Sequence, residues 1–419
     1  MVKVAFWDNQ LCERGTTIAL FDYAYYNIKC LNNESIILYD KTNKSNSDEM
    51  VKRFMKHFTV YPVENFSDVD NILVHEGCDV LYIIKYGPVD ERLSKICKTV
   101  IHSIFVNQPH GDVYASVSTS TVKYDKSIPI LPHIVQLPEV EGDLREELGI
   151  PLDATVYGRY GGPYEFNIKH VKEAVFEFAK RNPNVYFIFA STYPFCDPIH
   201  NIIHLEKITN IDRKVKFINT CDAMIHAREI GETFGLAIGE FSLKNKPVIT
   251  TPTEYPAHTN ILGDKALIYN NYEDVMRILS TFDRNKVKEK DWNAYRDYTP
   301  EKVMKIFNEL FLSDTKIKNT DAVVDMILNM RVNNKHEQAI NLGKYILEKK
   351  NVSFNSEQLS KFLDEYFISA FYHDKTVAMK VAQYYAKLTR EDPEFYNIFM
   401  KNEKHIRSNF GFLGFDVFV

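Results

Sequence analysis

Residues 223–249, AMIHAREIGETFGLAIGEFSLKNKPVI, combine a predicted strand, a glycine-bearing loop, a helix and a second strand. The loop holds Gly231 and Gly235, lies at the carboxyl end of the first strand and opens the helix. Backbone N–H groups and the helix dipole receive anions at such a position, and glycine permits the dihedrals and close approach that the loop needs. We expect the loop to hold a diphosphate through Thr233, Phe234, Gly235 and Leu236.

Two glutamates frame this loop, eight residues apart. Glu240 lies about one turn inside the predicted helix, where an ionised carboxylate can accept both hydroxyls of a ribose diol. Glu232 precedes the helix and can reach past the phosphates toward a transferred sugar. The spacing alone is common, but the pattern G-E-x-F-G-L-x-x-x-E before a Pro-Val-Ile strand is much more specific.

The segment resembles the donor-binding motif of retaining GT-B glycosyltransferases, especially those of the large family 4 type. The resemblance implies that Glu240 holds the donor ribose and that Glu232 is a catalytic residue that orients the donor sugar. It also implies that the loop binds the diphosphate without a metal or another cofactor. The expected reaction moves a sugar from a nucleotide-diphosphate sugar to an acceptor hydroxyl, such as that of a glycan, with retention of anomeric configuration.

A second matching segment is VYGRYGG, residues 156–162. The resemblance implies that Arg159 pairs with the donor phosphates as a second catalytic residue, a role that the planar guanidinium suits because it can bind phosphate oxygens with two hydrogen bonds. Family members usually add a lysine about five residues later, where this chain has Tyr164. Lys169 is the nearest substitute.

Further candidates lie outside these two motifs. Gly15 and Thr16 precede the first long helix, where family members place a glycine-bearing loop near the donor; a simple threonine helix cap is an equally good interpretation. His226, just before the main motif, is expected to support the loop or contact the sugar. The remaining histidines considered, His102, His110 and His133, are interpreted as structural.

From Val2 onward, short apolar strands alternate with helical stretches along the chain. This alternation predicts an α/β fold with a parallel, doubly wound sheet. The proline-bearing residues 112–148 are interpreted as a linker, after which the alternation restarts and includes a short strand predicted at Val215–Ile218. In such sheets ligands bind beyond the carboxyl ends of the strands. The predicted division is a Rossmann-like acceptor lobe (1–145), a Rossmann-like donor lobe (146–300), a closing helix (301–314) and a helical extension (315–419).

The helical extension contains two stretches that echo each other 39 residues apart. The matching positions are Ala339, Leu342, Gly343 and Tyr345 against Ala378, Val381, Ala382 and Tyr384. Helical hairpin repeats and a chance match between amphipathic helices explain this echo about equally well. We expect residues 315–419 to bind a protein partner or to self-associate.

Bulk properties exclude several classes of protein. The chain has 419 residues and a net charge of −5, so nucleic acid is a poor candidate for its main ligand. No apolar run approaches the roughly 18–20 residues of a membrane span, and the first residues do not read as a signal peptide. Six scattered cysteines without C-x-x-C spacing predict reduced thiols, no zinc site and a cytoplasmic location.

Motif absences narrow the enzyme classes. The chain has no G-x-S-x-G elbow, no P-loop and no D-x-D at a strand end, which removes α/β hydrolases, kinases and metal-dependent GT-A transferases from the leading set. An epimerase is disfavoured by the two lobes and by the lack of a G-x-G-x-x-G fingerprint. The main alternative is a GT-B-like scaffold that binds a glycan or nucleotide sugar without turnover and recruits a partner through its helical tail.

Overall fold

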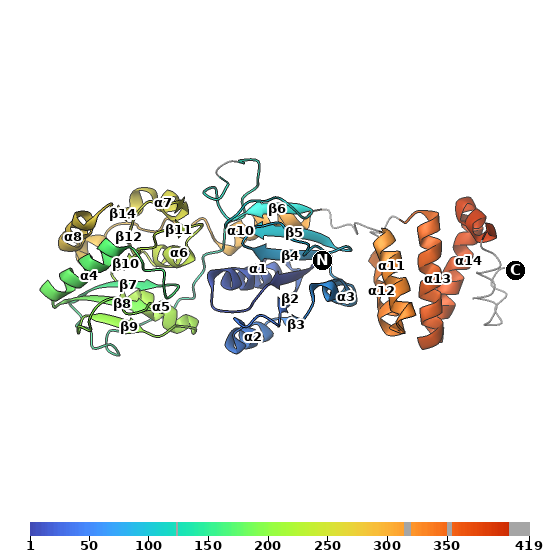
Figure 1. Ribbon diagram of the computed structural model, residues 1–419, viewed down its shortest axis with the longest axis horizontal. Helices are drawn as coiled ribbons and strands as arrows, with labels where there is room; N and C mark the ends of the chain where they lie inside the picture. The colour runs from blue at the N-terminus through green and yellow to red at the C-terminus, as the bar shows by residue number, and fades with distance from the viewer. Residues whose placement is uncertain (123–124, 314–319, 350–353, 402–419) are drawn as a thin grey trace.

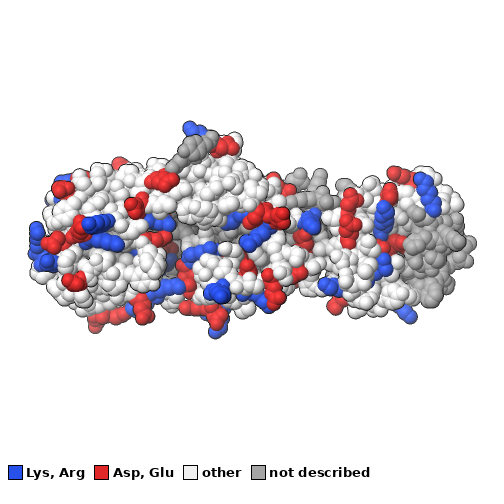
Figure 2. All heavy atoms as spheres, viewed as in Figure 1, with Lys and Arg blue, Asp and Glu red and all other residues white. Residues whose placement is uncertain are grey.

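The computed structural model describes residues 1–122, 125–313, 320–349 and 354–401. Figure 1 shows three bodies in a row: a first lobe in the middle, a second lobe on one side of it and a layer of helices on the other. No helix among the described residues is both long and apolar enough to cross a membrane. Figure 2 shows basic and acidic side chains interspersed over the visible face, with no extended surface of one sign.

The first lobe is built on a six-stranded parallel sheet with the strand order β3-β2-β1-β4-β5-β6. Its central strand β1 is buried almost throughout, as expected when helices cover both faces of a parallel sheet. The strands are β1 Lys3–Asp8, β2 Glu34–Asp40, β3 Thr59–Val63, β4 Val80–Lys85, β5 Lys98–Ser103 and β6 Val113–Ser116. The helices are α1 Gly15–Leu31, α2 Asp48–Met55, η1 Phe66–Asp68 and α3 Val69–Glu76.

The second lobe repeats this plan with a six-stranded parallel sheet of order β14-β12-β10-β7-β8-β9 and a two-stranded sheet of β11 and β13. The strands are β7 Thr155–Tyr160, β8 Val185–Ala190, β9 Ile202–Leu205, β10 Ala223–Ile225, β11 Gly231–Glu232, β12 Val248–Thr250, β13 Tyr255–Pro256 and β14 Ala266–Ile268. The helices are α4 Lys169–Arg181, α5 Ile211–Thr220, α6 Leu236–Leu243, α7 Ala257–Leu262, η2 Gly263–Lys265, α8 Tyr272–Thr281 and α9 Arg284–Lys288.

Two sequence-based assignments are wrong. The strand predicted at Val215–Ile218 lies inside α5, which the side chain of Asn210 caps by accepting from the N–H of Arg213 at 2.9 Å. Val215 and Ile218 are both fully buried, and three residues apart they lie on one face of a helix. The linker predicted from residue 112 starts too early, because β6 pairs with β5 as the edge strand of the first sheet.

After the second lobe the chain returns to the first. Helix α10, Pro300–Phe307, begins as expected behind Thr299, whose side chain accepts the N–H of Lys302, and continues into a π-helical turn, η3 Asn308–Leu312. The ring of Phe307 packs 5.6 Å from the rings of both Tyr23 and Tyr82. This segment therefore completes the core of the first lobe rather than that of the second.

Within the described residues the chain continues as helices: α11 Thr320–Val332, α12 His336–Lys349, α13 Ser356–His373, α14 Lys375–Glu391 and a helical stretch over residues 393–401. Their apolar core is continuous with that of the first lobe, since Tyr345 on α12 donates its hydroxyl to the carbonyl of Cys78 at 2.8 Å, just after α3. The echoing positions lie in α12 and α14 and most are buried, although Tyr384 is 39% exposed. The remainder of the predicted extension, residues 315–319, 350–353 and 402–419, lies outside the described residues.

Candidate active site

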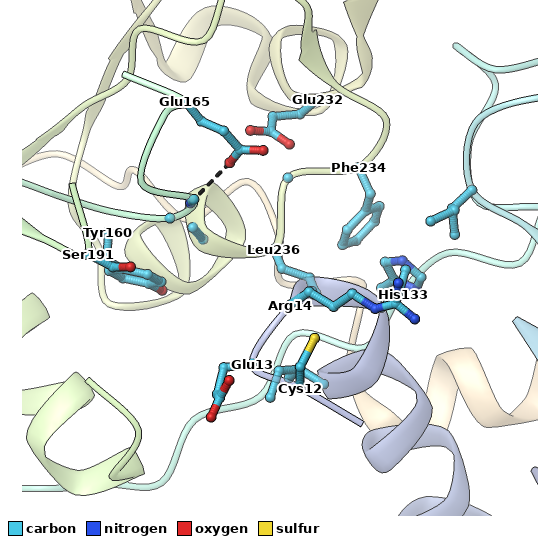
Figure 3. A pocket seen from close by; sticks show the side chains of 18 of the residues that line it. Cys12, Glu13, Arg14, His133, Tyr160, Glu165, Ser191, Glu232, Phe234 and Leu236 are labelled. Carbon is cyan, nitrogen blue, oxygen red and sulfur yellow. Dashed lines mark hydrogen bonds between the residues drawn. The ribbon is translucent and has the colours of Figure 1, made fainter. Parts of the chain in front are cut away.

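A cleft of about 1380 Å³ lies between the two lobes and is lined by residues of both. In Figure 3, Cys12, Glu13, Arg14 and His133 of the first lobe face a wall of second-lobe side chains. All of the site residues predicted from the sequence line this cleft: Gly15, Thr16, Arg159, His226, Glu232, Thr233, Phe234, Gly235, Leu236 and Glu240. Folding thus brings together two sequence motifs and a first-lobe loop that are far apart in the chain.

The loop before α6 has a backbone that requires glycine. Gly235, the N-cap of α6, has φ 86° and ψ 63°, and no side chain caps the helix there. Gly231 has φ 81°, and a Cβ at this position would collide with Thr253 and the carbonyl of Tyr255. The first amides of a helix have no partner within the helix, so the N-terminus of α6 offers N–H groups to the cleft.

Phe234 has a structural rather than a ligand-binding side chain. It is 2% exposed, and its ring packs 5.3 Å from that of His133 in an edge-on contact across the lobes. Its carbonyl accepts the hydroxyl of the buried Tyr295 at 2.9 Å. The side chain of Phe234 therefore anchors the loop, and the backbone of the loop is the part available to a ligand.

The carboxylate of Glu232 is held by a histidine and an arginine. Nε2 of His226 lies 3.2 Å from Oε1, and Nη1 of Arg228 donates to Oε2 at 2.8 Å. Burial alone raises the pKa of this carboxyl, but the hydrogen bond from His226 and the nearby charges of His226 and Arg228 outweigh burial and lower it. Glu232 is therefore ionised at neutral pH.

Behind Glu232 runs a buried hydrogen-bonded chain. Nδ1 of His226 lies 2.9 Å from the hydroxyl of Thr250, and Nε2 of His258 lies 3.0 Å from the same hydroxyl. Burial lowers the pKa of His258 to about 3, so this ring is neutral. An ionised Glu232 can only accept, so Nε2 of His226 donates to it, and Nδ1 is the ring nitrogen that meets the Thr250 hydroxyl. The chain fixes which ring nitrogen faces Glu232.

Arg159 is 3% exposed at the end of β7. It donates to the hydroxyl of Thr192 and, at 3.2 Å, to the carbonyl of Gly162. Burial lowers the pKa of Arg159 to about 10, so the guanidinium remains charged at neutral pH. Its position beside the α6 loop is compatible with phosphate binding.

Glu165 lies between two arginines and was not singled out in the sequence. Its Oε1 is 2.8 Å from Arg228, its Oε2 is 4.0 Å from Arg159, and the same Oε2 accepts the N–H of Gly162 at 3.1 Å (Figure 3). One carboxylate thus takes up two guanidinium groups and a backbone amide that a phosphate would also bind. Only the fold reveals this arrangement, because an acidic residue two positions from Gly-Pro carries no sequence signal.

The prediction that Lys169 supplies the second phosphate contact, in place of the expected lysine, is wrong. The side chain of Lys169 is 89% exposed and pairs with Glu173 on α4, and it does not line the cleft. Tyr164, at the position where the lysine was expected, is 76% exposed, and its ring lies 4.8 Å from that of Tyr193 in a tilted contact. Other cations line the cleft instead, namely Arg14, Arg53, Lys85, Arg92, Lys207, Lys214 and Arg228.

Glu240 lies in α6 and has two hydrogen-bond partners from other elements of the second lobe. The hydroxyl of Tyr160 donates to Oε2, and Nζ of Lys214 lies 2.5 Å from Oε1. Neither contact was predicted: Lys214 lies in α5, directly before the residues that were misassigned as a strand, and Tyr160 follows Arg159 at the end of β7. These two partners hold the carboxylate in place where it lines the cleft.

On the first-lobe side, the threonine-cap interpretation is wrong. Arg14 is the N-cap of α1 and makes no side-chain cap bond, Thr17 donates to Asp8 at 2.8 Å, and the buried hydroxyl of Thr16 has no partner among the described residues. A Cβ on Gly15 would lie 3.6 Å from Leu236, so the loops of the two lobes meet here. Nearby, Lys207 pairs with Glu13 across the cleft at 2.5 Å.

The other histidines have the structural positions expected of them. His102 is fully buried, pairs with the hydroxyl of Tyr82 at 2.7 Å and does not line the cleft. Nε2 of His110 lies 3.1 Å from Lys85, outside the cleft lining. His133 does border the cleft, but it is 6% exposed and its Nδ1 lies 3.3 Å from the hydroxyl of Tyr23.

No family model and no curated protein matches this sequence. Solved structures do match its fold. Alr3699/HepE from Anabaena, in complex with UDP-glucose, has 13% identity and a TM-score of 0.52 over 74% of this chain and 96% of its own. A glycosyltransferase from Rickettsia africae has 13% identity and a TM-score of 0.53 over 75% and 99%. WaaG, a glycosyltransferase of lipopolysaccharide biosynthesis, has 12% identity and a TM-score of 0.50 over 73% and 99%.

These similarities define the class of fold. Two parallel-sheet Rossmann-like lobes facing a cleft, with matches that span nearly the whole length of each solved structure, confirm the predicted α/β GT-B architecture. Because each solved structure leaves about a quarter of this chain unmatched, the GT-B body accounts for only part of the protein.

Proposed function

We propose that the protein is a GT-B glycosyltransferase that transfers a sugar from a nucleotide-diphosphate sugar to an acceptor hydroxyl, with retention and without a metal. The observation that carries this proposal is the ionised Glu232, which shares the cleft with Arg159 and the N-terminus of α6. In this proposal the second lobe binds the donor and the first lobe receives the acceptor.

The leaving diphosphate is the group whose charge grows in the transition state. The amides at the N-terminus of α6 and the guanidinium of Arg159 stabilise that charge in the cleft between the lobes, where fixed dipoles act more strongly than in water. Arg228, which pairs with Glu165, adds a second guanidinium. It reaches the phosphates when Glu165 moves aside or when Glu165 and the phosphates share the guanidinium. The cations of this chain thereby perform the task of neutralising the leaving group.

The two glutamates recognise the rest of the donor. A carboxylate offers about four acceptor positions, and His226 and Arg228 occupy one on each oxygen of Glu232. The remaining positions accept hydroxyls of the transferred sugar. Glu240 has the same arrangement with Tyr160 and Lys214, so its free positions accept the ribose diol.

In the reaction, the acceptor oxygen bonds to the anomeric carbon on the face from which the diphosphate departs. The bond between that carbon and the diphosphate oxygen breaks, and the acceptor proton passes to a diphosphate oxygen. No protein base is required for this step. Contact between the lobes, such as that of Gly15 with Leu236, limits access of water to the donor.

A donor screen tests the proposal. UDP-glucose is a suitable first donor, because the Anabaena protein of the same fold is described in complex with it; GDP- and ADP-sugars complete the set. One nucleotide series should raise Tm and release nucleotide on incubation, and EDTA should leave the rate within about twofold. Proton NMR of the product reports the anomeric configuration. The transferase proposal fails if no nucleotide sugar raises Tm or releases nucleotide.

One observation favours the non-catalytic scaffold as a second candidate. Glu165 occupies the guanidinium of Arg228 and approaches that of Arg159, which weakens the cationic field that a diphosphate meets. A scaffold would bind a nucleotide sugar and leave it intact with every acceptor tried. Glu165→Gln separates the two candidates, since it should tighten donor binding in both but raise turnover only in an enzyme.

A further inference from the structure

The mouth of the cleft carries an exposed aromatic side chain that the proposed donor site does not use. Tyr86, directly after β4, is 56% exposed, and Val89 in the same loop is 59% exposed. Both line the cleft. They lie beyond the carboxyl ends of the first-lobe strands, the edge at which α/β sheets bind ligands.

Tyr86 is held in a fixed orientation despite its exposure. Its ring stacks on that of Phe105 at 4.9 Å with an interplanar angle of 17°. Its carbonyl accepts two backbone N–H groups, from Phe105 at 3.1 Å and Val106 at 2.9 Å. The next residue, Gly87, has φ 133°, and a Cβ there would collide with the carbonyl of Val106. The backbone is therefore specialised to present one open aromatic face.

The stacked pair also contacts the loop of the proposed donor site. Phe105 meets Tyr255 of the second lobe edge-on at 5.6 Å and 87°. Tyr255 lies in β13, which pairs with β11, the strand of Gly231 and Glu232, and its N–H donates to the carbonyl of Ile230 at 3.1 Å. Phe105 and Tyr255 thus connect Tyr86 to the strand that carries Glu232, and Tyr86 and Glu232 line the same cleft.

Hydrogen-bonding groups border the aromatic face. Lys85 lies 2.7 Å from Asp90 and 3.1 Å from His110, and Lys85 and Asp90 both line the cleft. A sugar ring matches such a surface, because it has an apolar C–H face that packs on an aromatic ring and a rim of hydroxyls that need polar partners. An acyl chain matches less well, since the exposed residues of this loop, Tyr86, Pro88 and Val89, form only a small apolar area beside the charged Lys85 and Asp90.

We propose that Tyr86, stacked on Phe105, is the acceptor subsite and receives a pyranose ring of a carbohydrate acceptor. This inference rests on the proposed transferase function and adds the class of acceptor to it. The ring packs with its apolar face on Tyr86, and one of its hydroxyls points toward the donor sugar at Glu232. Rigid presentation of the aromatic side chain reduces the entropy that acceptor binding must overcome.

The test uses the full-length protein, the donor that it turns over and three probes: the methyl glycosides of glucose, galactose and N-acetylglucosamine. At least one probe should increase nucleotide release above the hydrolysis rate. Tyr86→Ala should then raise the KM of that probe about tenfold, the loss expected for one aromatic contact, while the donor KM shifts by less than about twofold. Tyr86→Phe, which keeps the ring, should restore the acceptor KM to near that of the wild type.

Tyr396→Ala is the matched control, because Tyr396 is 47% exposed and lies in the C-terminal helices, away from the cleft lining. It should change neither KM. The acceptor inference is overturned if donor hydrolysis proceeds but no glycoside stimulates it, or if stimulation has the same KM in Tyr86→Ala. Absence of any donor turnover by the wild type counts against the proposed function instead, so the two failures are distinct.

Discussion

The ammonium of Lys214 lies 2.5 Å from Oε1 of Glu240, while the hydroxyl of Tyr160 donates to the other carboxylate oxygen. Two donors on opposite oxygens fix the plane of the carboxylate before any ligand arrives. Pre-organisation of this kind reduces the entropy lost on binding. Under the proposed function, the donor ribose meets a carboxylate that is already oriented.

Replacement of Glu240 tests this role. Glu240→Gln removes the charge and substitutes a donor N–H for one acceptor oxygen, so charge-assisted hydrogen bonds to a diol are lost. We expect the Kd for the preferred nucleotide to rise about 10- to 100-fold, as loss of about 1.5–3 kcal/mol implies. Isothermal titration calorimetry measures it. Glu173→Gln, on the exposed face of α4, is the matched control, and equal affinities in the two variants would refute the assignment.

Arg159 is the most informative position for catalysis. Arg159→Ala should reduce kcat about 100- to 1000-fold, because it removes a charge that stabilises the leaving diphosphate. Arg159→Lys should recover little of this loss, since an ammonium cannot bind two phosphate oxygens in a fork. Steady-state nucleotide release gives kcat, and circular dichroism establishes that each variant is folded. Wild-type kcat in both variants would remove Arg159 from the site.

Thr250 links His226 to His258 and tests the buried chain behind Glu232. Thr250→Val keeps the shape but leaves buried ring nitrogens without a partner, which costs about 1–3 kcal/mol of stability. We expect a lower Tm and, because His226 loses the hydroxyl that holds its ring against Glu232, a kcat that falls about tenfold. Thr250→Ser restores the hydroxyl and should restore kcat. A purely structural threonine would change Tm alone.

Asp22 of α1 gives a pH-dependent prediction. Burial raises the pKa of its carboxyl to about 7; Glu240 adds to the rise, and Lys214 and Arg53 oppose it. Between the lower unfolded-state pKa and the raised folded-state pKa, the folded protein binds more protons than the unfolded chain, so the Asp22 contribution to stability falls as pH rises.

Asp22→Asn removes that penalty and should raise Tm relative to the wild type. The advantage should grow as pH rises toward about 7 and level off above it. Differential scanning calorimetry across the pH range measures it. A Tm difference that is independent of pH would show that Asp22 does not titrate as described.

The part of the site that could be predicted from the sequence is the part encoded locally. Gly231, Glu232, Gly235 and Glu240 lie on one loop and one helix, so the sequence spacing alone sets their relative positions. The confirmed GT-B fold likewise follows from strands and helices that alternate along the chain. Local patterns fail where the signal is short, as at Val215–Ile218, where four residues fit a strand and a helix equally well.

The remaining features depend on tertiary contacts. Glu165 and Arg228 belong to different loops of the second lobe and meet only in the folded cleft. The proposed acceptor subsite depends on contacts between Tyr86, Phe105 and Tyr255, which come from three segments and two lobes. None of these residues belongs to a sequence motif. Lys169 fails as a substitute because its helix turns it toward solvent, which its distance in sequence from Arg159 does not reveal.

The return of α10 to the first lobe has a consequence for how the protein is made. Phe6, Tyr82 and Phe307 share one core, although Phe307 follows the entire second lobe in the chain. A ribosome therefore releases the complete second lobe while the first still lacks part of its interior. The second lobe can fold on emergence, whereas the nascent first lobe keeps an open apolar surface, of the kind that chaperones bind, until residues 300–312 appear.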